Sequence, residues 1–172
     1  MSQIEIAVLD ATAAKAAISE LAEVLADCVE GGASVSFMSP YSRADAARFF
    51  EKVAASVARD ETVLVVARLD GRIAGTVQLG IDMPPNQPHR GDIKKLLVHR
   101  AARRHGLGGK LMERAEAEAK ARGRTLLVLD TASGDAERIY ERGGWQRVGV
   151  VPDYAMWPQG GFCATTFFYK RV

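Results

Sequence analysis

The segment that most constrains the fold is a glycine-rich, basic turn between an apolar run and a helical run. Residues 92–98 are typical of a strand, and residues 106–122 have the apolar spacing of a helix. The turn between them, Arg103 to Lys110, carries three glycines in four positions. The first N–H groups of a helix lack intrahelical partners and lie at its positive dipole end. A strand, a glycine-rich turn and a helix N-terminus together predict a site for an anion such as phosphate.

Two common phosphate motifs do not fit this turn. The Walker loop requires Gly-Lys-Ser/Thr, but Lys110 is followed by Leu111. The dinucleotide fingerprint G-x-G-x-x-G has Leu111 in place of its third glycine. The pattern that fits is R-x-x-G-x-G, with Arg103, Gly106 and Gly108 at its fixed positions. This hexapeptide is also compatible with a basic turn that binds nothing, so the rest of the chain has to decide.

Length and charge limit the remaining classes. The 172 residues suit a single domain, 1–172. The net charge of +2 does not support nucleic-acid binding, and the basic cluster at 100–110 suits one small polyanion. No apolar run reaches the roughly 20 residues of a membrane span. The first residues also lack a signal-peptide layout, so we expect a cytoplasmic protein. The two cysteines and three histidines show no metal-ligand spacing, so no metal is expected.

Apolar periodicity and turn signals predict a mixed order of strands and helices. Early consecutive strands, followed by a crossover through a helix, indicate a mixed sheet. The dipeptide Asp70-Gly71 predicts a hairpin, and Ser42 and Ser133 are expected to cap the second and fourth helices. The expected strands are residues 3–8, 62–69, 72–81, 92–98, 125–129, 145–151 and 162–169. The expected helices are residues 11–30, 42–58 and 106–122, with a short fourth helix after Ser133.

A second motif carries a family resemblance. The segment from Ala136 to Trp145 resembles the A-x-x-h-Y-x-x-x-G-F segment (h is apolar) of the GNAT family of N-acetyltransferases, with Trp145 in place of Phe. With the R-x-x-G-x-G turn, the resemblance covers nearly the whole chain. It implies the α+β GNAT acyltransferase fold: a mixed, mostly antiparallel seven-stranded sheet with splayed fourth and fifth strands, and four helices. Residues 30–38 and 129–131 also resemble the tabtoxin-resistance branch, whose members acetylate a toxic amino-acid analogue.

The resemblance implies acetyl-CoA as the cosubstrate. The pantetheine arm would pair with the backbone of Leu97 and Val98 like an added strand. Ser133 stands where many family members have Asn, so a hydroxyl would replace one amide contact to pantetheine. A side chain at Gly106 or Gly108 would intrude on the pyrophosphate. The residues implied for the pyrophosphate loop are Arg103, Arg104, His105, Gly106, Leu107, Gly108, Gly109 and Lys110.

Acetyl transfer to an amine requires a neutral nitrogen, and an alkylamine has a pKa of about 10.4. Asp92 and Asp130 are the candidates for removing the proton, directly or through water. Either could instead bind the acceptor's ammonium, or only cap a helix or begin a strand. The resemblance gives Tyr140 the role of general acid toward the departing thiolate; the alternative is an aromatic core residue. The amide of Val98 would hold the oxyanion.

The sequence therefore predicts an N-acetyltransferase that moves an acetyl group from acetyl-CoA directly to the amine of a small acceptor. The acceptor is expected to resemble an amino acid, an antibiotic or a toxin. Two alternatives stay open: a protein-lysine or N-terminal acetyltransferase, and a non-catalytic acyl-CoA-binding protein. An acyl-cysteine route is disfavoured because Cys28 and Cys163 lie in apolar segments without a neighbouring histidine. The expected partners are acetyl-CoA and the amine, with no nucleic acid and no membrane, and a homodimer is compatible with the sequence.

Overall fold

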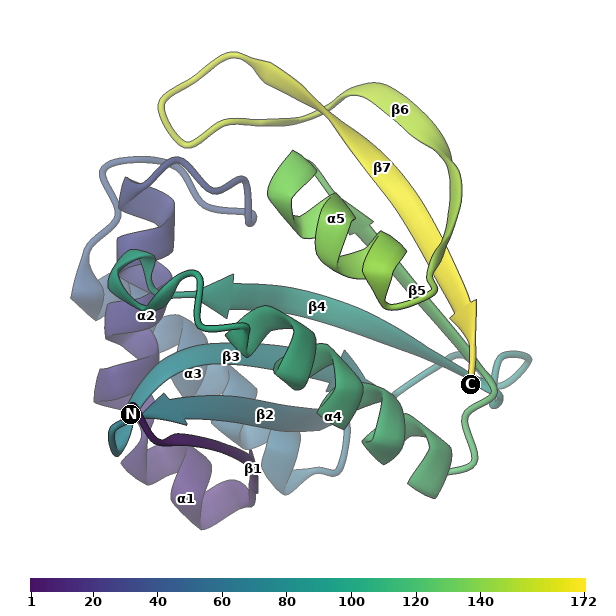
Figure 1. Ribbon diagram of the computed structural model, residues 1–172, viewed down its shortest axis with the longest axis horizontal. Coiled ribbons are helices and arrows are strands. Elements are labelled where there is room, and N and C mark those ends of the chain that lie inside the picture. The colour runs from purple at the N-terminus through teal and green to yellow at the C-terminus, as the bar shows by residue number, and fades with distance from the viewer.

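The computed structural model describes residues 1–172 and contains one seven-stranded sheet with helices on both faces (Figure 1). The strand order is β1-β2-β3-β4-β5-β7-β6, and every neighbouring pair except β4–β5 is antiparallel. The mixed, mostly antiparallel sheet expected from the sequence is confirmed.

The strands are β1 (Ile4–Leu9), β2 (Thr62–Leu69), β3 (Arg72–Gly80), β4 (Arg90–Val98), β5 (Leu126–Thr131), β6 (Gln146–Met156) and β7 (Phe162–Arg171). The helices are α1 (Ala11–Ala16), α2 (Ile18–Glu30), α3 (Arg43–Ala58), α4 (Leu107–Ala121) and α5 (Gly134–Arg142), with a 3-10 turn at Arg100–Ala102.

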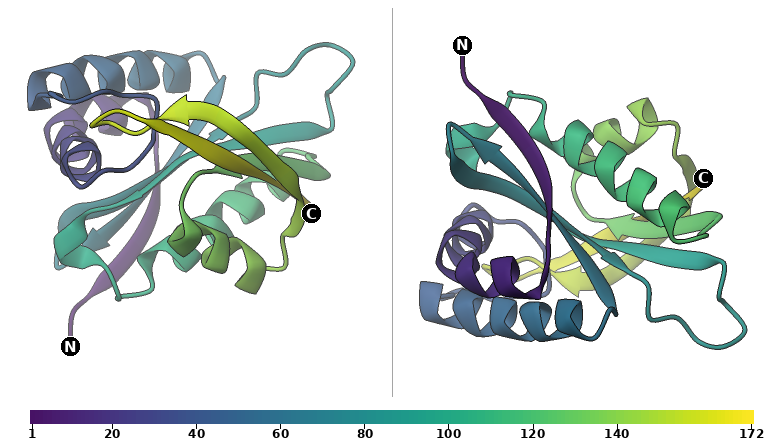
Figure 2. Two further views of the ribbon diagram at one scale, coloured as in Figure 1. Left: turned by 90° about the horizontal axis from the view of Figure 1, so that it is seen from above. Right: turned by 90° about the horizontal axis from the view of Figure 1, so that it is seen from below.

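Each face of the sheet has its own hydrophobic core. Figure 2 shows α1, α2 and α3 against one face and α4 and α5 against the other. On the first face, Leu21 of α2 and Phe50 of α3 share a core with Leu64 of β2. On the second face, Leu111 of α4 shares a core with Val65, the next residue of β2. Successive strand residues point to opposite faces, so β2 contributes to both cores and is buried on both sides.

The first helical region differs from the single helix predicted for residues 11–30, so the chain has five α-helices instead of four. Asp10 caps α1 by accepting a hydrogen bond from the Ala13 amide at 2.8 Å, and the helix ends at Ala17. No glycine or proline marks this break. The two helices pack differently, α1 against α3 and β1, and α2 against α3, β3 and β4. Tertiary packing therefore accompanies a break that has no local signal. None of the helices combines the length and apolar character needed to cross a membrane.

Strands β4 and β5 pair only at their beginnings. Residues 90–92 lie opposite residues 126–128, and no further pair follows. Because β4 continues to Val98 and β5 to Thr131, an open edge of β4 faces the end of β5. Figure 1 shows the two strands diverging, with β7 beside β5 on its far side. The predicted splay is confirmed, and the space between the diverging strands is called the β4–β5 wedge below.

A β-bulge interrupts β4 inside this wedge. Two β4 residues, 95 and 96, lie opposite a single β3 residue, 77, between the pairs Lys94–Gln78 and Leu97–Thr76. Lys95 has φ +53°. Ile93 and Leu96 belong to or pack against the α4 core, whereas Leu97 belongs to the α2–α3 core. Lys94 and Lys95, which lie between Ile93 and Leu96, therefore both project toward the α2–α3 side. This is expected for a bulge, which breaks the alternation of side chains.

Candidate active site

The glycine-rich turn and the start of α4 form a cradle for an anion. Gly106 is the N-cap of α4 with φ +72°, and no side chain caps the helix. The first N–H groups of α4 consequently remain available to a ligand. A Cβ built on Gly106 would meet no atom within 4 Å, so the space in front of the turn is open. The left-handed backbone favours glycine at this position.

Three cations border this cradle without carboxylate partners. Arg103, Arg104 and Lys110 are exposed and take part in no ion pair, and the first turn of α4 has no acidic residue. The exposed His105 ring contacts its own turn, with Nδ1 3.1 Å from the carbonyl oxygens of Ala102 and Arg103. His105 therefore orders the turn, while backbone amides and cations remain for the ligand. These residues fit the diphosphate group of acetyl-CoA.

Gly108 serves a different purpose from the one expected. A Cβ at Gly108 would lie 2.8 Å from Cδ1 of Ile139 on α5, closer than real side chains approach. A side chain there would enter the interface between α4 and α5, whereas the sequence analysis had it intruding on the pyrophosphate. The missing Cβ of Gly108 is thus directed at α5, and a contact of Gly108 with the pyrophosphate stays a prediction. Gly108 leaves room for the end of the Ile139 side chain.

We expect Gly108→Val to destabilise the fold rather than the ligand complex. The clashing atom is the end of the half-buried Ile139 side chain, which can turn aside, so the free energy of unfolding should fall by about 1 kcal/mol, the lower end of the overpacking range. Denaturant titration measures that loss, and calorimetry should give an acetyl-CoA affinity of the folded protein close to wild type. Ile139→Val removes the clashing methyl group, so the double variant should be more stable than the sum of the two single changes. Strict additivity would contradict this account of Gly108.

The open edge of β4 turns the amide of Val98 toward the wedge. The His99 amide donates to the Ala74 carbonyl at 2.9 Å and so points to β3. Because N–H groups alternate in direction along a strand, that of Val98 points to the opposite side. Leu97 is only 2% exposed, and its carbonyl oxygen lies 3.0 Å from an ideal Cβ on Gly75 of β3. Of the two predicted pantetheine contacts, Val98 is the one with its N–H toward the ligand space.

Both predicted carboxylates lie at the narrow end of the wedge. A cavity of about 390 Å³ is lined there by residues of β4 and β5, including Asp92 and Asp130. Asp92 pairs with Arg90, with 3.2 Å between Nε and Oδ1. Asp130 is exposed, forms no ion pair and accepts a hydrogen bond from the Thr165 hydroxyl at 2.7 Å. Asp130 is therefore the more available of the two for an acceptor's amine.

Tyr140 combines a core position with a free hydroxyl. The residue is 4% exposed, and its ring centroid lies 6.0 Å from that of Trp145 and 5.7 Å from that of Phe168. Burial first, and then the negative charge of Asp130, raise the pKa of Tyr140 well above its ordinary value, and no internal hydrogen bond holds the hydroxyl. The phenol is thus protonated at neutral pH and available as a donor.

Ser133 caps a helix, and both cysteines are buried. The Ser133 hydroxyl caps α5 by accepting a hydrogen bond from the Ala136 amide at 3.4 Å. Burial, and secondarily the charge of Asp27, raise the pKa of Cys28 to about 11, and Cys163 is also buried. Thiols of this kind carry little thiolate and are poor nucleophiles. No three His, Cys, Asp or Glu side chains are grouped as metal ligands.

Lys95 was not among the residues predicted from the sequence. It projects from the β4 bulge to residues 31–42, the loop between α2 and α3, which is named the 31–42 loop. Its Nζ donates to the Ser36 hydroxyl at 2.8 Å and lies 5.6 Å from the centroid of the Phe37 ring. The one signal available was a pair of lysines, Lys94 and Lys95, inside an otherwise apolar strand. The bulge that turns both toward the same face cannot be read from the sequence.

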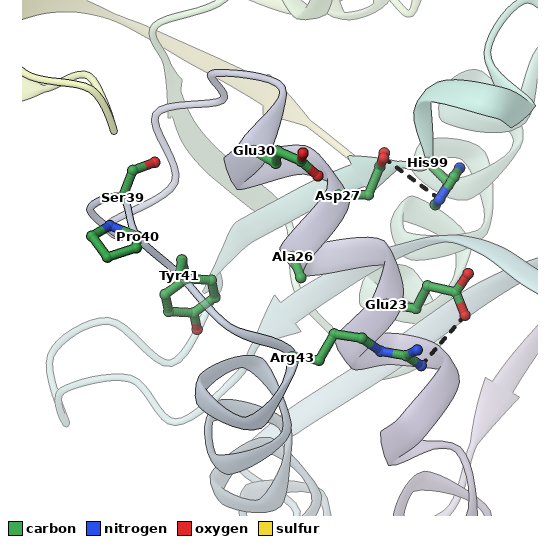
Figure 3. Close-up of a pocket in the computed structure, with 9 residues that line it drawn as sticks. All are labelled: Glu23, Ala26, Asp27, Glu30, Ser39, Pro40, Tyr41, Arg43 and His99. Carbon is green, nitrogen blue, oxygen red and sulfur yellow. Dashed lines mark hydrogen bonds and ion pairs between the residues drawn. The ribbon is translucent and has the colours of Figure 1, made fainter.

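A larger cavity, of about 530 Å³, lies along the outer face of α2 (Figure 3). Its charges are mostly paired internally: Arg43 lies 3.5 Å from Glu23, and His99 lies 3.6 Å from Asp27. Neither the candidate carboxylates nor Tyr140 contribute to it, so the wedge is the better candidate for the chemistry. The cavity is lined by Glu23, Ala26, Asp27, Glu30, Ser39, Pro40, Tyr41, Arg43 and His99.

Solved structures share this fold along nearly the whole chain. An N-acetyltransferase from Staphylococcus aureus Mu50 superposes with a TM-score of 0.80 at 19% identity, covering 98% of both chains. A phosphinothricin acetyltransferase from Sinorhizobium meliloti, in complex with acetyl-CoA, gives a TM-score of 0.76 at 16% identity, covering 98% of this chain and 88% of that one. At these identities the likeness shows the fold.

Sequence comparison gives the family. An IAA acetyltransferase from Azospirillum brasilense is 32% identical over 101 residues, which is 58% of this chain and 64% of that protein. The matched part of this chain thus spans less than two thirds of that relative's length. The model of the acetyltransferase (GNAT) family matches residues 18–145, which include the open edge of β4, the cradle at α4 and Tyr140. The chain therefore belongs to the acetyltransferase (GNAT) family.

Proposed function

We propose that this protein transfers the acetyl group of acetyl-CoA to the amine of a small, amino-acid-like acceptor in the β4–β5 wedge. The observation that carries the proposal is the separation of β4 from β5 beside the anion cradle at the start of α4. That separation leaves the N–H of Val98 without a strand partner and opens a cavity at Asp130. A thioester held at the open edge would thus meet an amine held near Asp130.

Each residue then has a distinct task. The α4 cradle binds the diphosphate and fixes the position of the pantetheine arm. The Val98 N–H donates to the thioester oxygen as negative charge develops on it. Asp130 takes a proton from the acceptor's ammonium, directly or through water, so that the nitrogen can attack. As the carbon–sulfur bond breaks, the Tyr140 hydroxyl gives its proton to the sulfur, whose thiol has a pKa close to the value of about 8.5 for cysteine. The second proton that the attacking nitrogen loses returns to the Tyr140 oxygen, directly or through water, so the phenol is regenerated.

The surroundings of the wedge favour a small acceptor over a protein. The 31–42 loop is tied to the β6–β7 hairpin, because the Ser34 hydroxyl donates to the Met156 carbonyl at 3.2 Å and the Ser39 amide to the Pro158 carbonyl at 2.9 Å. Figure 1 shows the tip of this hairpin beside the loop, above α2. Two joined segments leave little room for a polypeptide beside Ser36 and Phe37. This disfavours a protein-lysine or N-terminal substrate.

A screen of amino acids and antibiotic-like amines for release of the CoA thiol tests the proposal. We expect enzyme-dependent release with at least one small amine. Binding of acetyl-CoA without release across the panel would support the alternative of a non-catalytic acyl-CoA-binding protein. Faster acetylation of lysine peptides than of every small amine would support the protein acetyltransferase. Mass spectrometry of the acetylated product identifies the modified nitrogen in each case.

Asp130→Asn should lower turnover at neutral pH, because the amide keeps the shape of the side chain but not its basicity. Loss of a general base is typically an effect of about 10²–10⁴-fold. Turnover should partly recover as the pH rises and more free amine is present. The pH–rate profile of the variant against wild type measures this. If Asp130 only anchors the ammonium, the acceptor KM rises and kcat changes little.

Asp92→Asn is the matched control at the same cavity, since Asp92 is already paired with Arg90. We expect its pH–rate profile to follow that of wild type. A changed profile for Asp92→Asn together with an unchanged one for Asp130→Asn would assign the base to Asp92. Two unchanged profiles would exclude both carboxylates and leave a free amine or a water relay as the mechanism.

A cytoplasmic location and a homodimer remain predictions. The surface best suited to a second copy of the chain is on β6, an edge strand, and on the adjoining hairpin. Large apolar side chains are exposed there: Val148, Val150, Val151, Tyr154, Met156, Trp157 and Phe162.

A further inference from the structure

The backbone of Lys95 adopts an uncommon, left-handed conformation. Its φ of +53° is uncommon for a non-glycine residue. The bulge turns its side chain to the 31–42 loop, where it meets the Ser36 hydroxyl at 2.8 Å. Ser36 itself has φ +83°. Two residues in the left-handed region thus meet at one hydrogen bond, and strain of this kind is concentrated at ligand sites.

The ammonium of Lys95 has no carboxylate partner. Lys95 is half-buried and forms no ion pair, and its contacts are the Ser36 hydroxyl and the face of the Phe37 ring. Burial lowers the pKa of Lys95, the charge of Asp130 opposes that shift, and the charge of Lys94 adds to it. Enclosed cations are normally paired with an anion. The fold therefore keeps a positive charge here that its own side chains do not neutralise.

Asp130 provides the opposite charge on the same side of the sheet. The 31–42 loop that holds Lys95 also contacts β7, where the Cys163 thiol donates to the Ser34 hydroxyl at 3.4 Å, and Thr165, two residues farther along β7, holds Asp130. The charge of Asp130 acts on Lys95, but the two side chains form no ion pair, and the Asp130 carboxylate accepts a hydrogen bond from the Thr165 hydroxyl at 2.7 Å. Gln78, which lies opposite Lys94 in the β3–β4 register, is 6% exposed and has an amide nitrogen without a partner. Cross-strand partners project from the same face of a sheet. A carboxylate and an ammonium that lie near each other without pairing are complementary to a molecule with both charges.

We propose that Lys95 binds the acidic group of the acceptor while Asp130 faces its amine. The assignment rests on the acetyl transfer proposed above and goes further by naming the acceptor class. That class is zwitterionic amino acids and amino-acid analogues whose acidic group is free. Lys95 is then a specificity-determining residue: it lowers KM for acidic acceptors and takes no part in breaking or forming bonds.

Acceptor pairs that differ only in the anion test this in the wild-type enzyme. L-methionine with L-methioninamide and L-phenylalanine with L-phenylalaninamide keep the amine and the side chain but exchange the carboxylate for a neutral amide. L-phosphinothricin extends the panel to an acceptor with two acidic groups. We expect kcat/KM for the best acid to exceed that of its amide by about 10–100-fold, the range of a hydrogen bond to a charged group. Equal values, or a preference for the amide, would overturn the proposal.

Three substitutions test whether the preference for acidic acceptors comes from Lys95 or from a neighbouring charge. Lys95→Met should remove the preference by lowering kcat/KM for the acid, through KM, with the amide unchanged within about twofold. Lys95→Arg keeps the charge and should retain most of the preference. Lys94→Met removes the neighbouring charge, which lies against Gly80 of β3 and lines the cavity at Asp130, and should keep the preference. Loss of the preference in Lys94→Met but not in Lys95→Met would overturn the assignment.

A binding measurement without turnover distinguishes failure of this inference from failure of the proposed function. In the presence of CoA, N-acetyl-L-methionine should raise the melting temperature of wild type but not of Lys95→Met, and N-acetyl-L-methioninamide should raise neither. Acid-dependent stabilisation without acetylation of any amine would refute the transferase and retain the anion site. Acetylation without acid preference would retain the transferase and refute the anion site. Absence of both would refute both.

Discussion

Gly106→Val is expected to weaken acetyl-CoA binding by at least about 100-fold, equivalent to about 2.8 kcal/mol. Gly106 has φ +72° at the N-cap of α4, and its missing Cβ faces open space in front of the free helix amides. A branched side chain would fill the space assigned to the diphosphate and push the ligand away from those amides. Hydrogen bonds to charged groups contribute about 1.5–3 kcal/mol each, so the loss of two accounts for the effect. Isothermal calorimetry with acetyl-CoA measures it.

Gly123→Val is a closely matched control for this change. Gly123 follows the other end of α4, has φ +70°, and would also place a Cβ in open space. Both substitutions force a branched residue into the left-handed region, at about 1–2 kcal/mol of strain. Both variants should therefore lose similar stability, and only Gly106→Val should lose affinity. An affinity of Gly106→Val within about twofold of wild type, or equal losses in both variants, would remove the cradle from the binding site.

The parts of the fold that depend on local signals were predictable. Asp70 and Gly71 have φ +51° and +84°, as a tight hairpin between β2 and β3 requires. Ser42 caps α3 in a reciprocal pair with Asp45, where the sequence has a cap residue before a helical run. The glycine-rich turn lies at the N-terminus of α4, as its position after an apolar strand implied. In each case a few neighbouring residues determine the geometry.

The parts that depend on distant contacts were not predictable. The break at Ala17 has no helix-breaking residue, and the atom that a side chain at position 108 would meet comes from Ile139 on another helix. The bulge at Lys95 arises from the register against β3, which is set by the whole pair of strands. Both carboxylates were candidates for the base in the sequence. Only the structure pairs Asp92 with Arg90 and leaves Asp130 to Thr165.

The position of Tyr140 makes it a sharp test of leaving-group protonation. Its ring is fixed between Trp145 and Phe168, and Trp145 is itself held by a hydrogen bond from its indole N–H to Glu116 on α4, at 2.9 Å. Its hydroxyl binds nothing within the protein. Substitution by phenylalanine therefore keeps the packing and leaves no buried group unsatisfied, so the melting temperature should be unchanged.

Tyr140→Phe should consequently lower kcat by about 10²–10⁴-fold, the usual effect of losing a general acid, with acetyl-CoA affinity close to wild type. Because burial and Asp130 hold the pKa of Tyr140 well above its ordinary value, the phenol stays protonated from acidic to mildly alkaline pH. Wild-type turnover should therefore show no alkaline decline from Tyr140 in that range. Single-turnover kinetics, with acceptor and acetyl-CoA saturating, isolates the chemical step from product release.

Tyr169→Phe is the matched control, because it also removes a phenol oxygen. The Tyr169 hydroxyl already donates a hydrogen bond to Gln146 on β6. Its turnover should equal that of wild type, which shows whether loss of any phenol in this half of the sheet affects the rate. If Tyr140→Phe and Tyr169→Phe both turn over like wild type in single-turnover conditions, Tyr140 is a core residue alone. The thiolate would then leave unprotonated or take its proton from solvent. If only Tyr140→Phe is slow, its affinity for acetyl-CoA and its melting temperature identify the cause. When both equal the wild-type values, the loss of rate comes from the missing proton donor.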